Sequence, residues 1–323
     1  MIDQYGRNID YMRISVTDRC NLRCLYCMPE EGIECLNPSD ILSFEEIVTT
    51  AEAAALLGIK KIKITGGEPL VRKDIPNLIG KIKGIKGIEE VTMTTNGILL
   101  KNMAKDLKQA GLDGINISLD TIDPKRFKVL TRFDKLDEVL AGIREISSLG
   151  IKTKLNCVPI NKIGEEELTK IAEFSGGNIL VRFIELMPIG LGKEFQLIPY
   201  QTVKKILEDK YGASRLNPKK FGNGPAVYYD FPGLSGSIGF ITAMSHEFCG
   251  TCNRIRLTAA GDIKLCLHHM EGISLKPYLE NHISKDKLAE LLKEVIYQKP
   301  AHHCFHEEKG QDVEWRNMVQ IGG

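Results

Sequence analysis

Six of the nine cysteines in this 323-residue chain form two triads, one near each end of the sequence. The triads are, in chain order, Cys20, Cys24 and Cys27 (C-x3-C-x2-C), then Cys249, Cys252 and Cys266 (C-x2-C-x13-C). Three thiolates on a short loop can hold three irons of a [4Fe–4S] cube and leave the fourth iron without a protein ligand. An open coordination position is typical of reactive metal sites, because structural sites are normally closed by four ligands.

Zinc is the alternative metal for both triads. At the first triad zinc would need a fourth cysteine or histidine, and no histidine precedes His246. At the second triad His268 and His269 follow closely, so the spacing alone leaves zinc and iron–sulfur open. The remaining cysteines stand alone, and we predict that they are small buried side chains or free thiols. They are Cys35, Cys157 and Cys304.

The first triad, with Tyr26 before its third cysteine, resembles the signature of radical S-adenosylmethionine (SAM) enzymes. The resemblance implies that the open iron chelates SAM and that an electron from the cluster cleaves its sulfonium to a 5′-deoxyadenosyl radical. The segment Gly66-Gly67-Glu68-Pro69 resembles the glycine-rich segment of that family, which meets the methionine amino group. By the same resemblance the residues that contact SAM are Tyr26, Gly67, Ser118 and Met187.

From Tyr11 to the closing Gly322-Gly323 the chain is similar to one radical SAM subfamily, the GTP cyclases of molybdenum cofactor biosynthesis. The block 13–21, RISVTDRCN, is part of the resemblance. It implies that the second triad also carries a [4Fe–4S] cluster, whose open iron contacts guanine. It further implies conversion of GTP to (8S)-3′,8-cyclo-7,8-dihydroguanosine 5′-triphosphate, by hydrogen abstraction at C3′ and addition to C8. The product would pass to cyclic pyranopterin monophosphate synthase, and flavodoxin or ferredoxin would supply electrons.

A triphosphate needs a basic cradle, and several cations are spaced to form one. Arg254 and Arg256 would point to the same side of an extended segment. The resemblance implies that either arginine assists reduction of a guanine-centred radical, and that the family usually has arginine in place of Lys63. The implied GTP contacts are Arg13, Lys63, Thr94, Lys154, Arg254, Ile255 and Arg256.

The elements that must position these residues alternate between short β-rich runs and longer helical ones. One face of the predicted strands is polar, with residues such as Arg13, Lys63 and Lys154, and the opposite face is apolar. We therefore predict an α/β fold, an incomplete six-unit (β/α) TIM-like barrel around a polar cavity; a sheet with one solvated face is the alternative. The predicted strands are 11–16, 60–65, 91–95, 115–119, 153–158 and 180–184. The predicted helices include 43–57, which opens with Ser43 and Glu46 as a capping box, 200–211 and 285–298.

After Gly190 the regular alternation of β-rich and helical runs ends, and we place a domain boundary near Gly212. Residues 1–212 would form the barrel with the first cluster. Residues 213–323 would form a smaller α+β domain with the second cluster and the GTP site. The terminal Gly322 and Gly323 are expected to reach the GTP site, because glycine lets the backbone approach a ligand closely. Their expected apolar anchors are Trp315, Met318, Val319 and Ile321.

Composition limits the remaining possibilities. The net charge is +1 and the pI is about 7.5, which argues against nucleic acid as a partner. No apolar run approaches the ~18 residues of a membrane span, and the polar segment 1–10 lacks a secretory signal pattern, so we expect a cytoplasmic protein. The sequence leaves the oligomeric state open, a homodimer included. Two rivals are a peptide-modifying radical SAM maturase, which usually has more C-terminal cysteines, and a metal-ribbon binding module.

Overall fold

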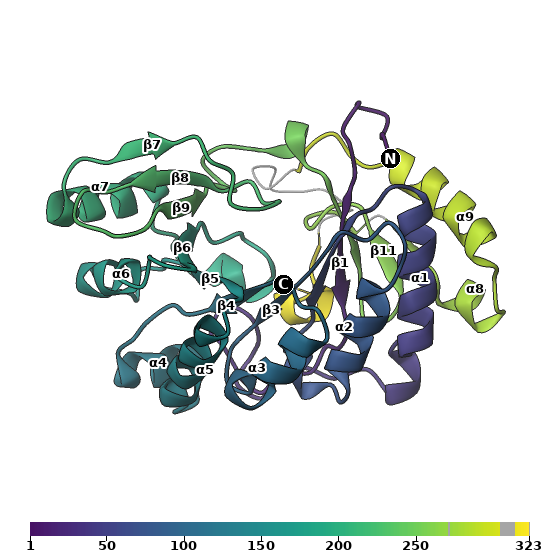
Figure 1. The fold of residues 1–323 in the computed structure, drawn as a ribbon, viewed down its shortest axis with the longest axis horizontal. Helices are drawn as coiled ribbons and strands as arrows, with labels where there is room; N and C mark the ends of the chain where they lie inside the picture. The colour runs from purple at the N-terminus through teal and green to yellow at the C-terminus, as the bar shows by residue number, and fades with distance from the viewer. Residues whose placement is uncertain (271, 304–313, 323) are drawn as a thin grey trace.

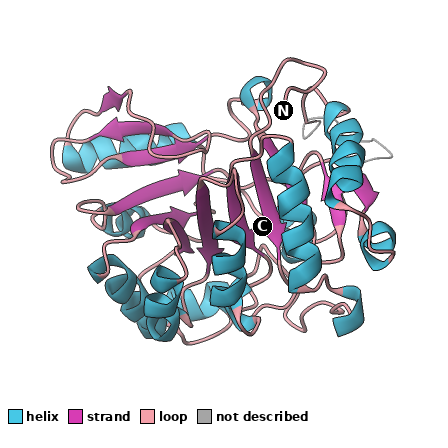
Figure 2. Cartoon of the chain, turned by 45° about the vertical axis from the view of Figure 1, so that its right-hand side comes forward, coloured by secondary structure: helices cyan, strands magenta, loops and turns pink. Residues whose placement is uncertain are grey.

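The computed structural model describes residues 1–270, 272–303 and 314–322, and their strands form one curved sheet (Figures 1 and 2). The strand order is β12-β11-β10-β1-β2-β3-β4-β5-β6-β9-β8-β7, so the sheet is open between two edge strands. The eight central strands run parallel. They are β1 (Tyr11–Ser15), β2 (Lys61–Thr65), β3 (Glu90–Thr95), β4 (Gly114–Ser118), β5 (Lys152–Cys157), β6 (Ile179–Ile184), β9 (Ile238–Ile241) and β10 (Arg254–Leu257).

The strands β1 to β6 are the six predicted ones, and no predicted bound differs from the observed one by more than one residue. The other two parallel strands come from the segment after Gly212, where β9 extends the sheet beyond β6 and β10 extends it beyond β1. Antiparallel strands complete the edges: β7 (Arg215–Asn217) and β8 (Val227–Asp230) beside β9, and β11 (Asp262–Lys264) and β12 (Gly272–Ser274) beside β10. The incomplete (β/α) barrel is therefore confirmed, while the boundary near Gly212 stays a prediction.

Most helices surround the strands (Figure 1). They are α1 (Phe44–Leu56), α2 (Ile75–Lys83), α3 (Leu100–Gln109), α4 (Pro124–Thr131), α5 (Leu136–Ser148), α6 (Glu165–Ala172), α7 (Tyr200–Tyr211), α8 (Lys276–Glu280), α9 (Lys285–Tyr297) and α10 (Met318–Ile321). Single-turn 3-10 helices lie at Pro38–Asp40, Pro69–Val71, Gly190–Glu194 and Cys249–Thr251. In the described residues no helix has the length and apolarity needed to span a membrane.

The predicted division of each strand into two faces is confirmed. Met12, Ile14, Ile62 and Ile64 are fully buried in the apolar core under the helices. The alternate residues of the same strands line the concave side of the sheet. The capping box predicted for the helix at Ser43 is also present, because Ser43 Oγ accepts from the Glu46 amide at 3.2 Å and the Glu46 carboxylate accepts from the Ser43 amide.

The C-terminal turn lies over the middle of the sheet in both views (Figures 1 and 2). Val319 and Ile321 are buried, and Met318 lines the cavity, as expected for anchors of the tail. Trp315 was expected to be a further anchor, and this expectation is wrong, because 69% of its surface is exposed.

Candidate functional site

A cavity of about 820 Å³ lies on the concave side of the sheet and holds both cysteine triads in its wall. The two triads are more than two hundred residues apart in sequence, yet they face one space. All the residues predicted to bind metal, SAM or GTP line this cavity, with one exception that is described below. The fold thus unites both halves of the predicted site.

The first triad lies on the loop after β1, and the glycine-rich segment after β2 holds that loop. The amides of Gly67 and Glu68 donate to the carbonyls of Thr17 and Arg19 at 2.7 and 2.8 Å. A Cβ at Gly67 would lie 2.4 Å from the Arg19 carbonyl oxygen, so only glycine allows this approach. The segment therefore sets the position of the chain immediately before Cys20.

The three thiols of this loop resist ionisation. Burial raises the pKa of Cys20 to about 11 and that of Cys27 to about 12. Burial, with repulsion from Cys27 and Cys20, raises the pKa of Cys24 well above its ordinary value. Three adjacent thiolates in this place need a cationic centre, so the donor set fits an iron–sulfur cluster.

Two carboxyl groups to which the sequence analysis gave no role, the buried Glu68 and the half-buried Asp120, hold neighbouring residues on the SAM side of the cavity. Glu68 accepts from the Thr95 hydroxyl at 2.7 Å and the Asn96 amide at 2.6 Å, and burial raises its pKa to about 7. Asp120 accepts from the Tyr26 hydroxyl at 2.5 Å and the Val158 amide at 2.8 Å, and burial raises its pKa to about 6. An acidic residue at the end of a buried strand was the signal available for Asp120.

These contacts place Tyr26, one of the residues predicted to bind SAM, against the end of β4. The other predicted residues, Gly67, Ser118 and Met187, also line the cavity on the same side as the first triad's loop or at the ends of β4 and β6. Active sites of parallel barrels lie at the carboxyl ends of their strands, because the loops there converge. The arrangement therefore suits a ligand bound next to the first triad.

A row of cations crosses the floor of the cavity in strand register. Arg256 pairs with Arg13 across β10 and β1, and Arg13 pairs with Lys63 across β1 and β2. The register of Lys63 continues through Thr92 and Gly114 to Lys152, and Lys154 lies two residues further along β5, paired with Asn116. These four residues were predicted as phosphate contacts, and all four side chains line the cavity.

The cations of this row lie close together, Lys63 buried and the other three half-buried, so each disfavours the charge of the next. Burial and the charges of Arg13 and Arg182 lower the pKa of Lys63 well below its ordinary value. Burial and Arg182 lower the pKa of Lys154 to about 8, and burial, with Arg13 and Arg254, lowers that of Arg256 to about 9. A bound polyanion would relieve this repulsion, so the row is suited to a phosphate chain.

Arg182 is a member of this cluster that sequence reasoning missed. It is buried on β6, donates to Asn156 Oδ1 at 2.6 and 2.9 Å, and lines the cavity. When the oxygen and nitrogen of the Asn116 side-chain amide are exchanged, its Oδ1 accepts hydrogen bonds from Arg182 and from Lys63. An arginine within the otherwise apolar run ILVRFI was the signal that marked it.

Ile255 is the exception among the predicted GTP contacts. Its side chain is fully buried in the core, and it does not line the cavity. Side chains alternate across β10, so Arg254 and Arg256 face the cavity and Ile255 faces away. The predicted GTP contact by Ile255 stays a prediction, and it would have to involve the backbone because the side chain faces the core. Arg254 stacks its guanidinium over the Phe248 ring at 5.1 Å.

The second triad has more positive surroundings than the first. Burial raises the pKa of Cys249. Burial would also raise the pKa of Cys252, but the neighbouring Lys299 and Arg254 outweigh it and lower that pKa. Lys299 is itself buried and donates to the carbonyl of Leu265, next to Cys266. Three cavity-lining thiols near fixed cations fit a negatively charged metal–thiolate centre.

The lone cysteines differ from one another. Cys157 is fully buried, as predicted for a small apolar side chain, and its sulfur lies 3.7 Å from the Asp120 carbonyl oxygen. Cys35 is an exposed free thiol. Cys304 lies outside the described residues.

The C-terminal tail lies against the cation row and the end of β1, and Met318 and Val319 line the cavity. Arg256 Nη1 donates to the Gly322 carbonyl at 2.8 Å. Gly322 has φ of 75°, and a Cβ there would lie 2.7 Å from Ser15 Cβ. The position thus requires glycine for both its backbone angle and its space. Gly323, the other half of the predicted pair, lies outside the described residues.

Comparison with known proteins agrees with this geometry. The family model of the radical SAM superfamily matches residues 14–175, and that described as Molybdenum Cofactor Synthesis C matches residues 179–305. A crystal structure of Streptococcus suis SuiB bound to precursor peptide SuiA has a similar fold, with a TM-score of 0.60 and 17% identity, over 98% of this chain and 71% of that one. The fold and the first triad together define a radical SAM enzyme.

Two curated relatives are similar over the full length of both chains. The GTP 3′,8-cyclase of Desulforamulus reducens is 45% identical over 331 residues, and that of Syntrophomonas wolfei is 44% identical over 330 residues. Both alignments cover 100% of this chain and 100% of the relative. The chain belongs to the GTP 3′,8-cyclase family.

Proposed function

We propose that this protein converts GTP to (8S)-3′,8-cyclo-7,8-dihydroguanosine 5′-triphosphate, the first step of molybdenum cofactor biosynthesis. The observation that carries the proposal is a single cavity with a radical SAM triad at one end, a second cysteine triad at the other and a row of cations between them. The cations suit the triphosphate. Their spacing along the sheet would hold the nucleoside between the two triads.

We assign the first triad to a [4Fe–4S] cluster with SAM, and the second to another [4Fe–4S] cluster. When bound, SAM and the first cluster supply a deoxyadenosyl radical. Tyr26, Gly67, Ser118 and Met187 would hold SAM. Arg13, Lys63, Thr94, Lys154, Arg182, Arg254 and Arg256 would hold GTP, so that C3′ faces the SAM side and guanine faces the second triad.

The chain's own residues would act by binding and orientation rather than by proton transfer. The guanidinium groups of Arg13 and Arg256 would fix phosphate oxygens with little loss of entropy, because the sheet already holds these two residues in register. The loop at 219–225 lines the same cavity and would exclude water from it. Arg254 or Arg256 would favour reduction of a guanine radical by placing positive charge beside it.

The proposal includes partners that follow from the chemistry. An external one-electron donor, such as flavodoxin or ferredoxin, must reduce the first cluster in each turnover. The cyclised nucleotide would be the substrate of cyclic pyranopterin monophosphate synthase. We further propose a cytoplasmic location and a possible homodimer.

The test is anaerobic incubation of the reconstituted protein with SAM, GTP and dithionite, followed by analysis of the nucleotide. We expect 5′-deoxyadenosine and the 3′,8-cyclised nucleotide. Cys24→Ala should abolish SAM cleavage, whereas Cys252→Ala should retain some uncoupled cleavage and lose the cyclised product. SAM cleavage by the wild type without GTP binding would instead favour a peptide-modifying enzyme. Normal GTP conversion by Cys252→Ala would limit the second centre to a structural role.

A further inference from the structure

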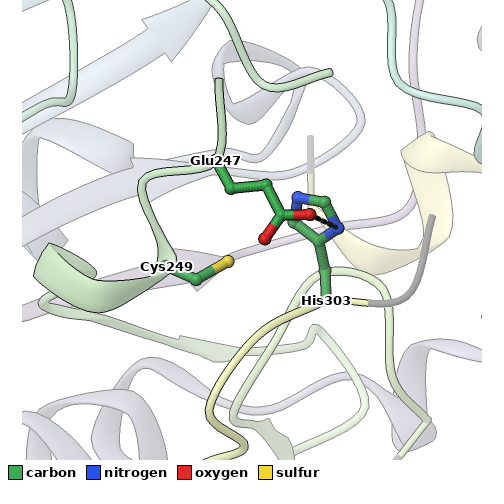
Figure 3. A group of neighbouring side chains, drawn as sticks. All are labelled: Glu247, Cys249 and His303. Atoms are coloured by element: carbon green, nitrogen blue, oxygen red, sulfur yellow. Dashed lines mark ion pairs between the residues drawn. The ribbon is translucent and has the colours of Figure 1, made fainter. Parts of the chain in front are cut away.

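A group of three side chains of metal-binding types, which includes Cys249, lies at the edge of the cavity. One ligand atom each from Glu247, Cys249 and His303 lies within 4.8 Å of the other two. The three side chains converge (Figure 3), and His303 Nδ1 is 3.9 Å from Glu247 Oε1. Carboxylate, thiolate and imidazole are the three donor types found in zinc sites.

The buried ion pair of Arg7 and Asp3 holds the segments that carry two of these ligands. The Arg7 guanidinium donates to the Cys249 carbonyl at 3.0 Å and to the Pro300 and Ala301 carbonyls at 2.7 and 3.0 Å. It also forms an ion pair with Asp3 at 2.6 Å, and both side chains are at most 4% exposed. One rigid fork thus holds the turn that carries Cys249 and the segment that leads to His303. The two ligands are therefore brought together by protein contacts alone.

The spacing of these ligand atoms suits one ion rather than a cube. Zn²⁺ holds thiolate sulfur at about 2.3 Å and imidazole nitrogen at about 2.0 Å, so two ligands of one tetrahedral ion lie roughly 3.5 Å apart. Thiolates of a [4Fe–4S] cube bind different irons and are spread more widely. Small side-chain movements would bring Glu247, Cys249 and His303 onto one ion, with a fourth position for water or for Cys252.

We propose that Glu247, Cys249 and His303 bind one zinc-type divalent ion when the second triad carries no iron–sulfur cluster. Cys249 belongs to both ligand sets, so the ion and the cluster exclude one another. Only this exclusion rests on the proposed function; the binding of the ion does not. The histidine ligand is His303, rather than the His268 or His269 that spacing in the sequence suggested.

The test uses the full chain, stripped of metal anaerobically, with Zn²⁺ alone as the probe in competition with a chromophoric chelator. We expect one tightly bound ion per chain, and Co²⁺ should give the visible spectrum of a tetrahedral site with thiolate ligation. His303→Ala and Glu247→Gln should each weaken binding at least about tenfold, and Cys249→Ala should abolish it. Glu247 is 42% exposed, so its substitution leaves the fold intact.

The matched control is His302→Ala, which changes the exposed neighbour of His303 and should leave affinity unchanged. Removal of all three thiols of the first triad should also leave it unchanged. Unaltered affinity in both His303→Ala and Glu247→Gln would overturn the site, as would its loss in His268→Ala alone.

The exclusion is measured by reconstitution after zinc loading. The zinc-loaded chain should take up about four irons and keep its ion, and the zinc-free chain should take up about eight. Eight irons together with retained zinc would overturn the exclusion. If the zinc-free chain takes up only four irons, the proposed second cluster fails, while the zinc measurements stand independently.

Discussion

Lys63 is a buried lysine whose surroundings indicate an anionic ligand. It is 8% exposed, lies between Arg13 and Thr92 in register, and forms no ion pair with a carboxylate within the described residues. We expect Lys63→Ala to weaken GTP binding by about 1.5–3 kcal/mol, the range for a hydrogen bond to a charged group, as measured by anaerobic calorimetry. Lys63→Arg should bind GTP almost as well as the wild type.

The control for this prediction is Lys61→Ala, on the same strand and the same side. The Lys61 ammonium is paired with Asp10 at 2.9 Å and does not line the cavity, so GTP affinity should not change. An unchanged affinity in Lys63→Ala would contradict the assignment of Lys63 to the phosphates.

Lys154 gives the binding a pH dependence. Its pKa is lowered to about 8 by burial and by Arg182, and a bound polyanion would raise it again. GTP binding is therefore linked to a proton: affinity is full below about pH 7 and falls as the pH rises through about 8. Lys154→Arg stays charged, so its affinity should fall less between pH 7 and 9. Parallel pH profiles for the two proteins would show that Lys154 does not titrate in this range.

At the residue scale the sequence predicts the cavity lining well, because strand alternation assigns each polar residue to one face. Arg13, Lys63 and Lys154 were found in this way. Arg182 was missed because its strand is otherwise apolar. Ile255 was included by a family resemblance that does not separate backbone from side-chain contacts, and its side chain faces the core.

The C-terminal tail is the element whose position is most sharply testable. Gly322→Ala should displace the tail, because the new Cβ would clash with Ser15 and the φ of 75° is unfavourable for alanine. We expect product formation to fall at least tenfold, about 1.4 kcal/mol, while SAM binding and both clusters remain. Deletion of Gly322 and Gly323 should have the same effect.

Gly150→Ala is the matched control, since Gly150 also has φ of 75° but has no atom within 4 Å of the added Cβ. It should cost stability and leave turnover per folded molecule unchanged. Equal turnover losses in the two variants would mean that backbone strain, and not the place of the tail, is responsible.

At the element scale, local patterns predicted six strands, three helices and the capping box at Ser43. They did not predict that β9 and β10 join the parallel sheet at opposite edges. These strands are only four residues long, and their pairing partners β6 and β1 are chosen by tertiary packing, for which a short segment carries no signal.

At the scale of the whole molecule, the two triads predict two cofactors per chain. Anaerobic reconstitution in zinc-free buffer should give about eight irons and eight sulfides, since each cube holds four. Cys24→Ala and Cys252→Ala should each retain about four irons. Tightly bound zinc with only four irons in the wild type, under these conditions, would show that the second triad does not hold a cube.

The overall architecture was predictable because alternating βα units admit few topologies. The convergence of the two triads on one cavity was not derivable from their spacing. It depends on how the last third of the chain packs against the barrel, and only the family resemblance indicated it.

The pairing of β10 with β1 bears on how the protein is made. The strand that carries Arg13, β1, gains its neighbour on the β10 side only when the segment around Arg256 has been synthesised, more than two hundred residues later. Such a high contact order slows folding, because a long loop must close before the pairing stabilises it. During synthesis the edge of β1 is exposed to other nascent chains. The cradle of cations is thus among the last parts to form, and an unfinished chain cannot hold a nucleotide.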